Sequence, residues 1–146
     1  MSDFRKLSDD VWASPQISTE EVREAHDRGF AMIINNRPDG EAEDQPSGEE
    51  IAAQAKELGL TYRAIPITPG GFGPGEVTQM VQALESAEGP VLAYCRSGTR
   101  STLLWSLAQA AEGQEPAKIA SAAAAAGYDI APVRALVDQL AARAKN

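Results

Sequence analysis

The sequence is poor in the two residues that most often form disulfides or bind metal ions. It has one cysteine, Cys95, and one histidine, His26. A single cysteine cannot form an intramolecular disulfide, and one cysteine with one histidine is too few for a typical zinc site. His26 falls on a predicted helix, where a surface position without a partner is usual. We therefore expect no disulfide and no metal ion, and no cofactor is implied.

Basic residues and long apolar runs are also scarce. The chain has 13 Lys and Arg against 21 Asp and Glu, a formal net charge of −8, which disfavours binding to nucleic acid and anionic membranes. The longest apolar run, residues 122–126, is far shorter than the roughly 20 residues of a membrane span. The first ten residues, MSDFRKLSDD, do not resemble a signal peptide. These absences predict a cytoplasmic protein that binds neither nucleic acid nor membranes.

The composition that remains is typical of a packed globule. Of the 146 residues, 43% are hydrophobic and 23% are charged, and a chain of this length is of ordinary single-domain size. We therefore expect one domain, residues 1–146.

Strand and helix signals alternate along this chain. Apolar runs bounded by turn residues predict strands at 11–13, 30–34, 60–67 and 91–94. Capping residues and helical periodicity predict helices at 19–28, 48–58, around 77–84, at 101–111 and over most of the remaining chain. Strand–helix repeats joined by right-handed crossovers give a parallel sheet covered on both faces. The sequence thus predicts a three-layer α/β fold with a central, mostly parallel sheet of four or five strands.

Three irregular segments each follow a predicted strand: residues 35–48, residues 68–75 and the segment that begins at Cys95. Ligands of such sheets bind at the carboxyl ends of the strands. We therefore expect the three segments to converge on one pocket.

Two of these segments carry further candidates for substrate binding. Arg37 has a guanidinium that suits a carboxylate or sulfonate, although a salt bridge with Asp39 or Glu41 explains it equally well. Asp39 is a second candidate in the same segment. Phe72, between glycines, fits either a pocket wall or simple packing into the fold.

The segment CRSGTRS, residues 95–101, is the strongest candidate for a site, and we call it the Cys loop. It joins a buried strand to a helix, so that backbone N–H groups and the helix N-terminus favour negative charge near Cys95. The same field favours the thiolate over the thiol. Gly98 allows close approach of the backbone, and Arg100 offers a bidentate fork for an oxyanion. The hydroxyl groups of the loop are expected to bind the substrate or the thiolate; they belong to Ser97, Thr99 and Ser101. Arg96 is expected to point outward and to aid substrate docking.

A free intracellular cysteine is most often a small buried apolar residue. In this chain the strand, Cys95, a polar turn with glycine, Arg100 and a helix occur together in the order that thiolate chemistry requires. That joint context favours a catalytic Cys95 and Arg100.

The Cys loop resembles the active-site loop of rhodanese-type sulfurtransferases, whereas the rest of the chain resembles the cysteine-dependent protein phosphatases. Both resemblances meet in the phosphatase-like domain of the bacterial beta-lactamase-hydrolase-like proteins. Residues 33–41 (IINNRPDGE), the strand at 62–67 and the Cys loop resemble that domain, over roughly residues 4–110. The resemblance implies a protein-tyrosine-phosphatase-like fold and a nucleophilic cysteine.

Two departures from the tyrosine phosphatases distinguish phosphate from sulfur chemistry. Those phosphatases have a His before the nucleophile and five residues between Cys and Arg, whereas this chain has Tyr94 and four residues. They also use an aspartate to protonate the leaving group, yet the segment 68–75 has no acidic residue before Glu76. Asp39 or Asp44 is a substitute, although turn formation explains both more simply.

The sequence therefore favours a thiolate-dependent sulfurtransferase that carries sulfane sulfur as a Cys95 persulfide. Its expected partners are a small anionic or persulfide substrate and an external thiol acceptor. One alternative is a phosphatase with a phosphocysteine intermediate, and a second is a pseudoenzyme that binds anions without turnover. The predicted C-terminal helix has an apolar stripe of Leu136, Val137 and Leu140. Such a stripe more often packs on its own core than on a partner, and homo-oligomerisation stays open.

Overall fold

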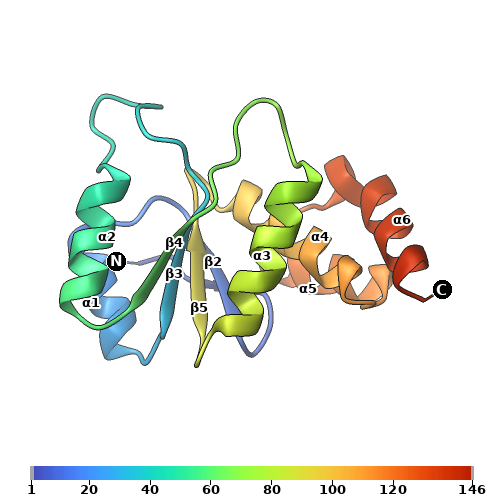
Figure 1. The fold of residues 1–146 in the computed structure, drawn as a ribbon, viewed down its shortest axis with the longest axis horizontal. Helices are drawn as coiled ribbons and strands as arrows, with labels where there is room; N and C mark the ends of the chain where they lie inside the picture. Colours follow the sequence, from blue (N-terminus) through green and yellow to red (C-terminus); the bar gives the residue numbers. More distant parts are fainter. Residues whose placement is uncertain (1, 146) are drawn as a thin grey trace.

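A five-stranded sheet forms the centre of the computed structural model, which describes residues 2–145 (Figure 1). The strands are β1 (Arg5–Lys6), β2 (Val11–Ser14), β3 (Met32–Asn35), β4 (Thr61–Ala64) and β5 (Val91–Tyr94). Their order is β1-β2-β5-β3-β4; β1 is antiparallel to β2, and all other pairs are parallel. The sheet is mostly parallel, as predicted, and β5 lies at its centre.

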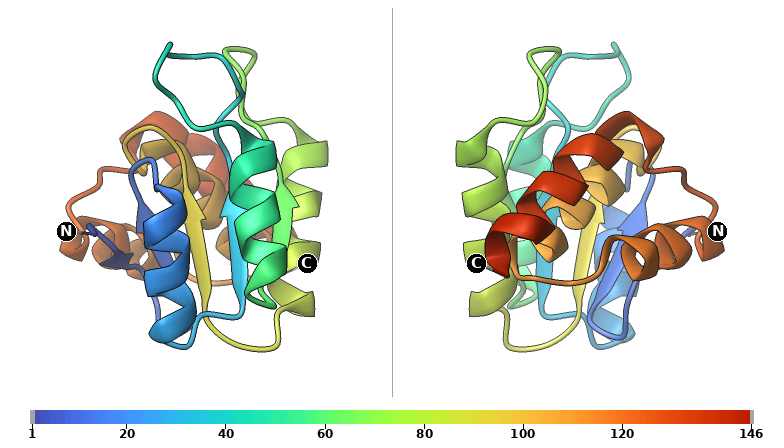
Figure 2. Two further views of the ribbon diagram at one scale, coloured as in Figure 1. Left: turned by 90° about the vertical axis from the view of Figure 1, so that its left-hand side faces the viewer. Right: turned by 90° about the vertical axis from the view of Figure 1, so that its right-hand side faces the viewer.

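Helices cover both faces of this sheet (Figures 1 and 2). One face carries α1 (Thr19–Asp27) and α2 (Gly48–Glu57), and the other carries α3 (Pro74–Ser86) and α4 (Thr99–Ala111). The C-terminal elements are α5 (Pro116–Ala125), the short 3-10 helix η1 (Ala131–Val133) and α6 (Arg134–Ala144); α5 and α6 pack against α4. The predicted three-layer α/β fold is confirmed. Among residues 2–145, every helix is too short or too polar to cross a bilayer.

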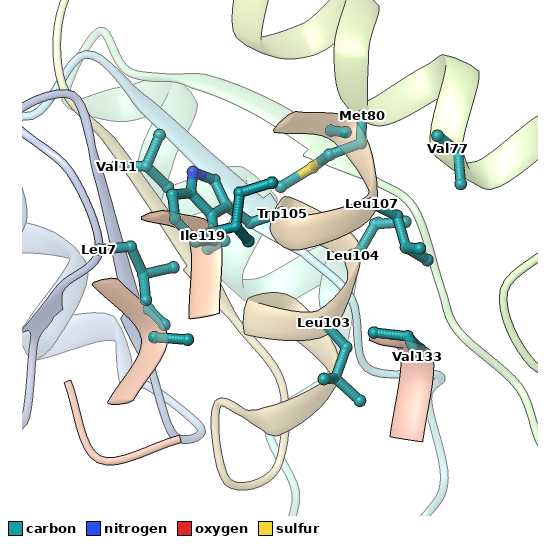
Figure 3. Packing of buried hydrophobic residues seen from close by; sticks show 14 of the residues in the cluster. Leu7, Val11, Val77, Met80, Leu103, Leu104, Trp105, Leu107, Ile119 and Val133 are labelled. Atoms are coloured by element: carbon teal, nitrogen blue, oxygen red, sulfur yellow. The ribbon is translucent and has the colours of Figure 1, made fainter. Parts of the chain in front are cut away.

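Side chains alternate across the buried strands and so divide the core into two clusters. Ile33 and Leu92 belong to the cluster under α1 and α2. Met32 and Ile34 belong to the larger cluster under α3 to α6. Figure 3 shows part of that larger cluster, where Trp105 of α4 lies among side chains from several other elements. Because both of their faces are buried, the central strands β3 and β5 are nearly continuous apolar runs in the sequence, whereas the edge strand β4 is largely exposed.

The ends of the helices follow from local chemistry. Ser18 and Ser47 each cap a helix through a reciprocal capping box, as expected for a serine three residues before a glutamate. α4 begins at Thr99, two residues earlier than predicted, because Gly98 adopts a positive φ of 91° and turns the chain directly into the helix.

The strand predicted at residues 60–67 is shorter, and this part of the prediction is wrong. β4 ends at Ala64, opposite Asn35 at the end of β3. Beyond this pair the Arg37 N–H donates to the Asn35 side chain at 2.9 Å instead of continuing the ladder. Ile65 and Ile67 are nonetheless buried, and their N–H groups donate to the carbonyls of residues 35 and 36 at 2.9 and 3.0 Å. The segment therefore stays attached to the carboxyl edge of the sheet without being a strand.

Candidate active site

Cys95 lies directly after the central strand, at the carboxyl edge of the sheet. Its backbone N–H donates to the Ser14 carbonyl at 3.3 Å, which continues the pairing of β5 with β2 by one residue. Its side chain is fully buried, and the Gly98 N–H donates to Cys95 Sγ at 3.1 Å. The Cys loop therefore curls back on its own sulfur, as the sequence predicts for an anion-stabilising turn.

The shape of this turn depends on the backbone conformation of Gly98. It caps α4 with φ of 91°, a left-handed value that only glycine adopts readily. There is also no room for a side chain, because a Cβ on Gly98 would lie 2.1 Å from Tyr128 Oη. The hydroxyl of Tyr128, which follows α5, donates to the Ser97 carbonyl at 3.1 Å.

Arg100 joins the three segments that follow β3, β4 and β5. Its two terminal nitrogens donate to the two carboxylate oxygens of Glu41, each at 2.8 Å. Nη1 also donates to the Ile67 carbonyl at 3.1 Å. Glu41 comes from the long loop after β3, and Ile67 from the segment after β4. The three segments therefore meet at one edge of the sheet (Figure 1). They do not line one common pocket as expected, because the cleft beside the first two segments has no residue of the Cys loop in its lining.

Arg37 is a buried second cation beside Arg100. Its side chain is only 5% exposed, and its Nε donates to Glu41 at 2.9 Å. Its Nη1 donates to the Gln16 side chain at 3.0 Å. Of the two roles expected for Arg37, the structure contains the salt bridge to Glu41. One carboxylate thus bridges two guanidiniums at the mouth of the Cys loop.

This bridge shifts the protonation of its members. Hydrogen bonds from Arg100, then from Arg37, lower the pKa of Glu41 to about 2 against the opposing effect of burial. The pKa of Arg100 is raised, first by Glu41 and further by the charge of a Cys95 thiolate. Glu41 is therefore held ionised, and the positive charge of Arg100 is stabilised by both the Glu41 carboxylate and the Cys95 sulfur.

The loop hydroxyls have different surroundings. Ser97 Oγ donates to Thr99 Oγ1 at 2.9 Å and accepts from the Thr99 N–H, so these two hydroxyls shape the turn. Ser101 Oγ is buried and has no hydrogen-bond partner among residues 2–145. The side chain of Arg96 is exposed, as expected.

Asp39 and Phe72 lie apart from the sulfur. Asp39 Oδ1 accepts the Gly48 N–H at 2.8 Å, which satisfies the first turn of α2. Phe72 is partly buried and packs against the larger core cluster, the second of the two roles expected for it. Asp39 nevertheless borders an open cleft of about 450 Å³ between the loop after β3, α2 and β4. Arg37, Tyr62 and Thr68 also line this cleft, whereas Cys95 does not.

Tyr94 occupies the position that precedes the nucleophile. Its side chain is buried, and burial raises the pKa of its hydroxyl, with a further contribution from Tyr62. A neutral phenol therefore lies where the tyrosine phosphatases have an imidazole.

The sequence does not indicate several residues of the site. It points to Glu41 only as a partner of Arg37, where the spacing of four residues is a recognisable signal. Its contact with Arg100 spans 59 positions, and no local pattern indicates it. The same is true of Gln16, which follows β2, and of Tyr128, which follows α5.

Comparison with known proteins gives consistent results. Residues 3–112 match the family described as "Beta-lactamase hydrolase-like protein, phosphatase-like domain". A beta-lactamase hydrolase-like protein of Xylella fastidiosa (strain Temecula1) is 35% identical over 101 residues, 69% of this chain and 23% of the relative. The chain therefore spans about a quarter of the length of that curated relative.

Two solved structures illustrate the shared fold. A Neisseria meningitidis Z2491 protein described as a "putative phosphatase" is 35% identical, with a TM-score of 0.82 over 94% of this chain and 98% of that one. Tk-PTP, at 15% identity, has a TM-score of 0.73 and covers 97% of this chain and 96% of its own. The expected protein-tyrosine-phosphatase-like fold is confirmed. Together with the matched range and the relative from Xylella, these likenesses show that the chain belongs to the phosphatase-like domain family of the beta-lactamase hydrolase-like proteins.

Proposed function

We propose that this protein is a sulfurtransferase that carries sulfane sulfur on Cys95. In the first step the Cys95 thiolate attacks the outer sulfur of thiosulfate, the S–S bond breaks, and sulfite leaves with the bonding electron pair. A persulfide remains on Cys95, and total charge is conserved. In the second step an acceptor thiolate attacks the outer persulfide sulfur, and Cys95 leaves as the thiolate. A glutathione persulfide serves as donor in the same way, with glutathione thiolate as the leaving group.

The pairing of Glu41 with two arginines, Arg100 and Arg37, is the observation that carries this proposal. Hydrolysis of a phosphate ester is helped by a carboxylic acid that protonates the leaving oxygen, and such an acid needs a pKa near the working pH. Glu41, the carboxylate bound directly to the Cys loop, has its pKa lowered to about 2 by Arg100 and Arg37. It has no proton to give. Sulfite and thiolate leaving groups require none.

The size of the Cys loop supports the same reaction. Four residues separate Cys95 from Arg100, so the turn offers fewer backbone N–H groups than the longer phosphatase loop. The Gly98 N–H already points at Cys95 Sγ. A persulfide or small anion suits such a turn better than a tetrahedral phosphoryl group.

The acceptor in this scheme is an external thiol. Cys95 is the only cysteine in the chain, so no second thiol of the chain can resolve the persulfide. Cys95 has no exposed surface, and donor and acceptor therefore reach it only when the bordering loops move apart. A reactive reduced thiol also fits a reducing compartment such as the cytoplasm.

Phosphoester hydrolysis is the second candidate, and the family favours it. The matched family is described as phosphatase-like, and the relative from Neisseria carries a phosphatase description. In that reaction the Cys95 thiolate attacks phosphorus, an alkoxide or phenoxide leaves and takes a proton, and water then hydrolyses the phosphocysteine. The proton must come from water or from a carboxyl group other than ionised Glu41.

A side-by-side assay separates the two reactions. The wild type and Cys95→Ser are tested for sulfur transfer from thiosulfate and glutathione persulfide, and for hydrolysis of an aryl phosphate. We expect sulfur transfer by the wild type alone, with a mass increase of about 32 Da on Cys95 after donor treatment.

The opposite result is equally clear. If the wild type hydrolyses aryl phosphate, Cys95→Ser does not, and neither transfers sulfur, the phosphatase hypothesis would be established. Binding of thiosulfate with neither turnover nor an adduct would indicate a pseudoenzyme. Arg23→Lys is the control for substitution as such, because this exposed arginine lies on α1, outside the Cys loop.

A further inference from the structure

The peptide group between Ser97 and Gly98 is anchored at both ends. Its carbonyl oxygen accepts the Tyr128 hydroxyl at 3.1 Å. Its N–H donates to Cys95 Sγ at 3.1 Å. One amide therefore connects a phenol outside the Cys loop to the sulfur inside it.

The planarity of the amide makes these two contacts interdependent. In a trans peptide the C=O and N–H bonds lie in one plane and point in opposite directions. A partner that holds the Ser97 carbonyl away from the sulfur necessarily directs the Gly98 N–H toward it. Gly98, at φ of 91°, is free of the steric barrier that would otherwise resist this orientation. Without an anchor on the carbonyl, the same freedom would allow the peptide to rotate away.

The Tyr128 hydroxyl is itself held in place. Tyr128 is only 8% exposed. The Arg5 guanidinium lies over its ring, 5.2 Å from the centroid, and Arg5 Nη1 donates to the Ala126 carbonyl at 3.3 Å. Gly98 lies close beside the hydroxyl end of the ring, where an added Cβ would be only 2.1 Å from Oη. These contacts orient a rigid phenol rather than a mobile one.

We infer that Tyr128 is a positioning residue for the nucleophile and that it acts through the Ser97–Gly98 peptide. Its hydroxyl fixes the direction of the Gly98 N–H and, by polarising the amide, strengthens the donation of that N–H to the Cys95 sulfur. A hydrogen bond to the charged form of a group favours that form. Tyr128 therefore increases the share of thiolate at a given pH. It lies outside the matched family range, residues 3–112.

Tyr128→Phe tests this role because it keeps the ring and removes only the hydroxyl. Cys95 is the single cysteine, so the pH dependence of alkylation by iodoacetamide follows its thiolate once the bordering loops have opened. We expect the pH midpoint of alkylation to rise by about half a unit. We also expect the amide proton of Gly98 to move upfield in the NMR spectrum, because its hydrogen bond to Cys95 Sγ weakens. The NMR measurement needs no access to the sulfur.

Ser106→Ala is the matched control. Ser106 Oγ donates to the Thr102 carbonyl at 2.8 Å within α4, so this variant also loses one buried side-chain hydrogen bond but leaves the Cys loop untouched. We expect a similar loss of stability with an unchanged alkylation midpoint and Gly98 resonance. If Tyr128→Phe behaves like Ser106→Ala in both readouts, Tyr128 is merely structural and the inference is wrong.

Neither readout requires turnover. The inference can therefore be tested separately from the proposed sulfur transfer. A shifted alkylation midpoint in Tyr128→Phe, together with a wild type that transfers no sulfur, would contradict only the proposed reaction. Conversely, an active sulfurtransferase with an unshifted Gly98 resonance would contradict only the role of Tyr128.

Discussion

Substitution of Gly98 by alanine combines two penalties that the structure allows us to separate. A residue other than glycine at φ of 91° costs about 1–2 kcal/mol of stability. The added methyl would also lie 2.1 Å from Tyr128 Oη and 2.9 Å from its Cζ, and such overpacking typically costs about 1–3 kcal/mol. We therefore expect Gly98→Ala to lower the free energy of unfolding by about 2–5 kcal/mol.

Gly29 provides a matched control within the same chain. It has nearly the same φ, 90°, but a Cβ there would meet nothing within 4 Å. Gly29→Ala should therefore show only the backbone penalty, about 1–2 kcal/mol. The difference between the two variants measures the contact with Tyr128.

A double-mutant cycle in urea unfolding completes the test. In a Tyr128→Ala background the clash is absent, and Gly98→Ala should cost no more than Gly29→Ala. Equal costs of Gly98→Ala with and without Tyr128, or a cost in the wild type as small as that of Gly29→Ala, would refute the packing argument.

Two further predictions concern the ion pairs at the mouth of the site. Arg100→Lys cannot reproduce the double contact with Glu41, so we expect at least about a tenfold fall in kcat/KM for thiosulfate. Arg23→Lys, at an exposed position of α1, should be nearly unchanged in the same assay. Glu41→Gln should lower the free energy of unfolding at pH 7 by about 1 kcal/mol or less, because Glu41 is 26% exposed and partly screened by solvent. The folded pKa of about 2 lies below the usual 4.5. The stabilisation by Glu41 is therefore present above pH 4.5 and disappears as the pH falls toward 2. Urea unfolding of the wild type and of Glu41→Gln across that pH range measures it. A difference in stability that grows as the pH falls would contradict the prediction.

The sequence allows the scaffold of the site to be predicted because the relevant signals are local. The buried strand that ends at Tyr94 and the polar turn after it are visible as an apolar run followed by glycine and hydroxyl residues. The parallel arrangement then brings the loops together at one edge. Where the neighbouring strand decides the outcome, the prediction fails: β4 ends at Ala64, opposite the end of β3 at Asn35, although Ile65 and Ile67 continue the apolar alternation.

The partners of the site are not predictable in the same way. Glu41 reaches Arg100 across 59 residues, and Tyr128 reaches Ser97 across 31. Both contacts depend on strand order and on how α5 packs outside α4. Neither property is encoded in a short stretch of sequence, so only the folded structure identifies these residues.

The position of Tyr128 bears on how this unit can be excised or grafted. A cut after residue 112, where the family match ends, would separate the Ser97 carbonyl from its phenol. It would also strip Ile119 and Val137 from a core that they share with Trp105. A fusion or minimal variant designed on the homologous boundary would therefore retain every residue of the CRSGTRS turn and still lose its support. Any such graft should therefore include the C-terminal helices α5 and α6 together with the turn.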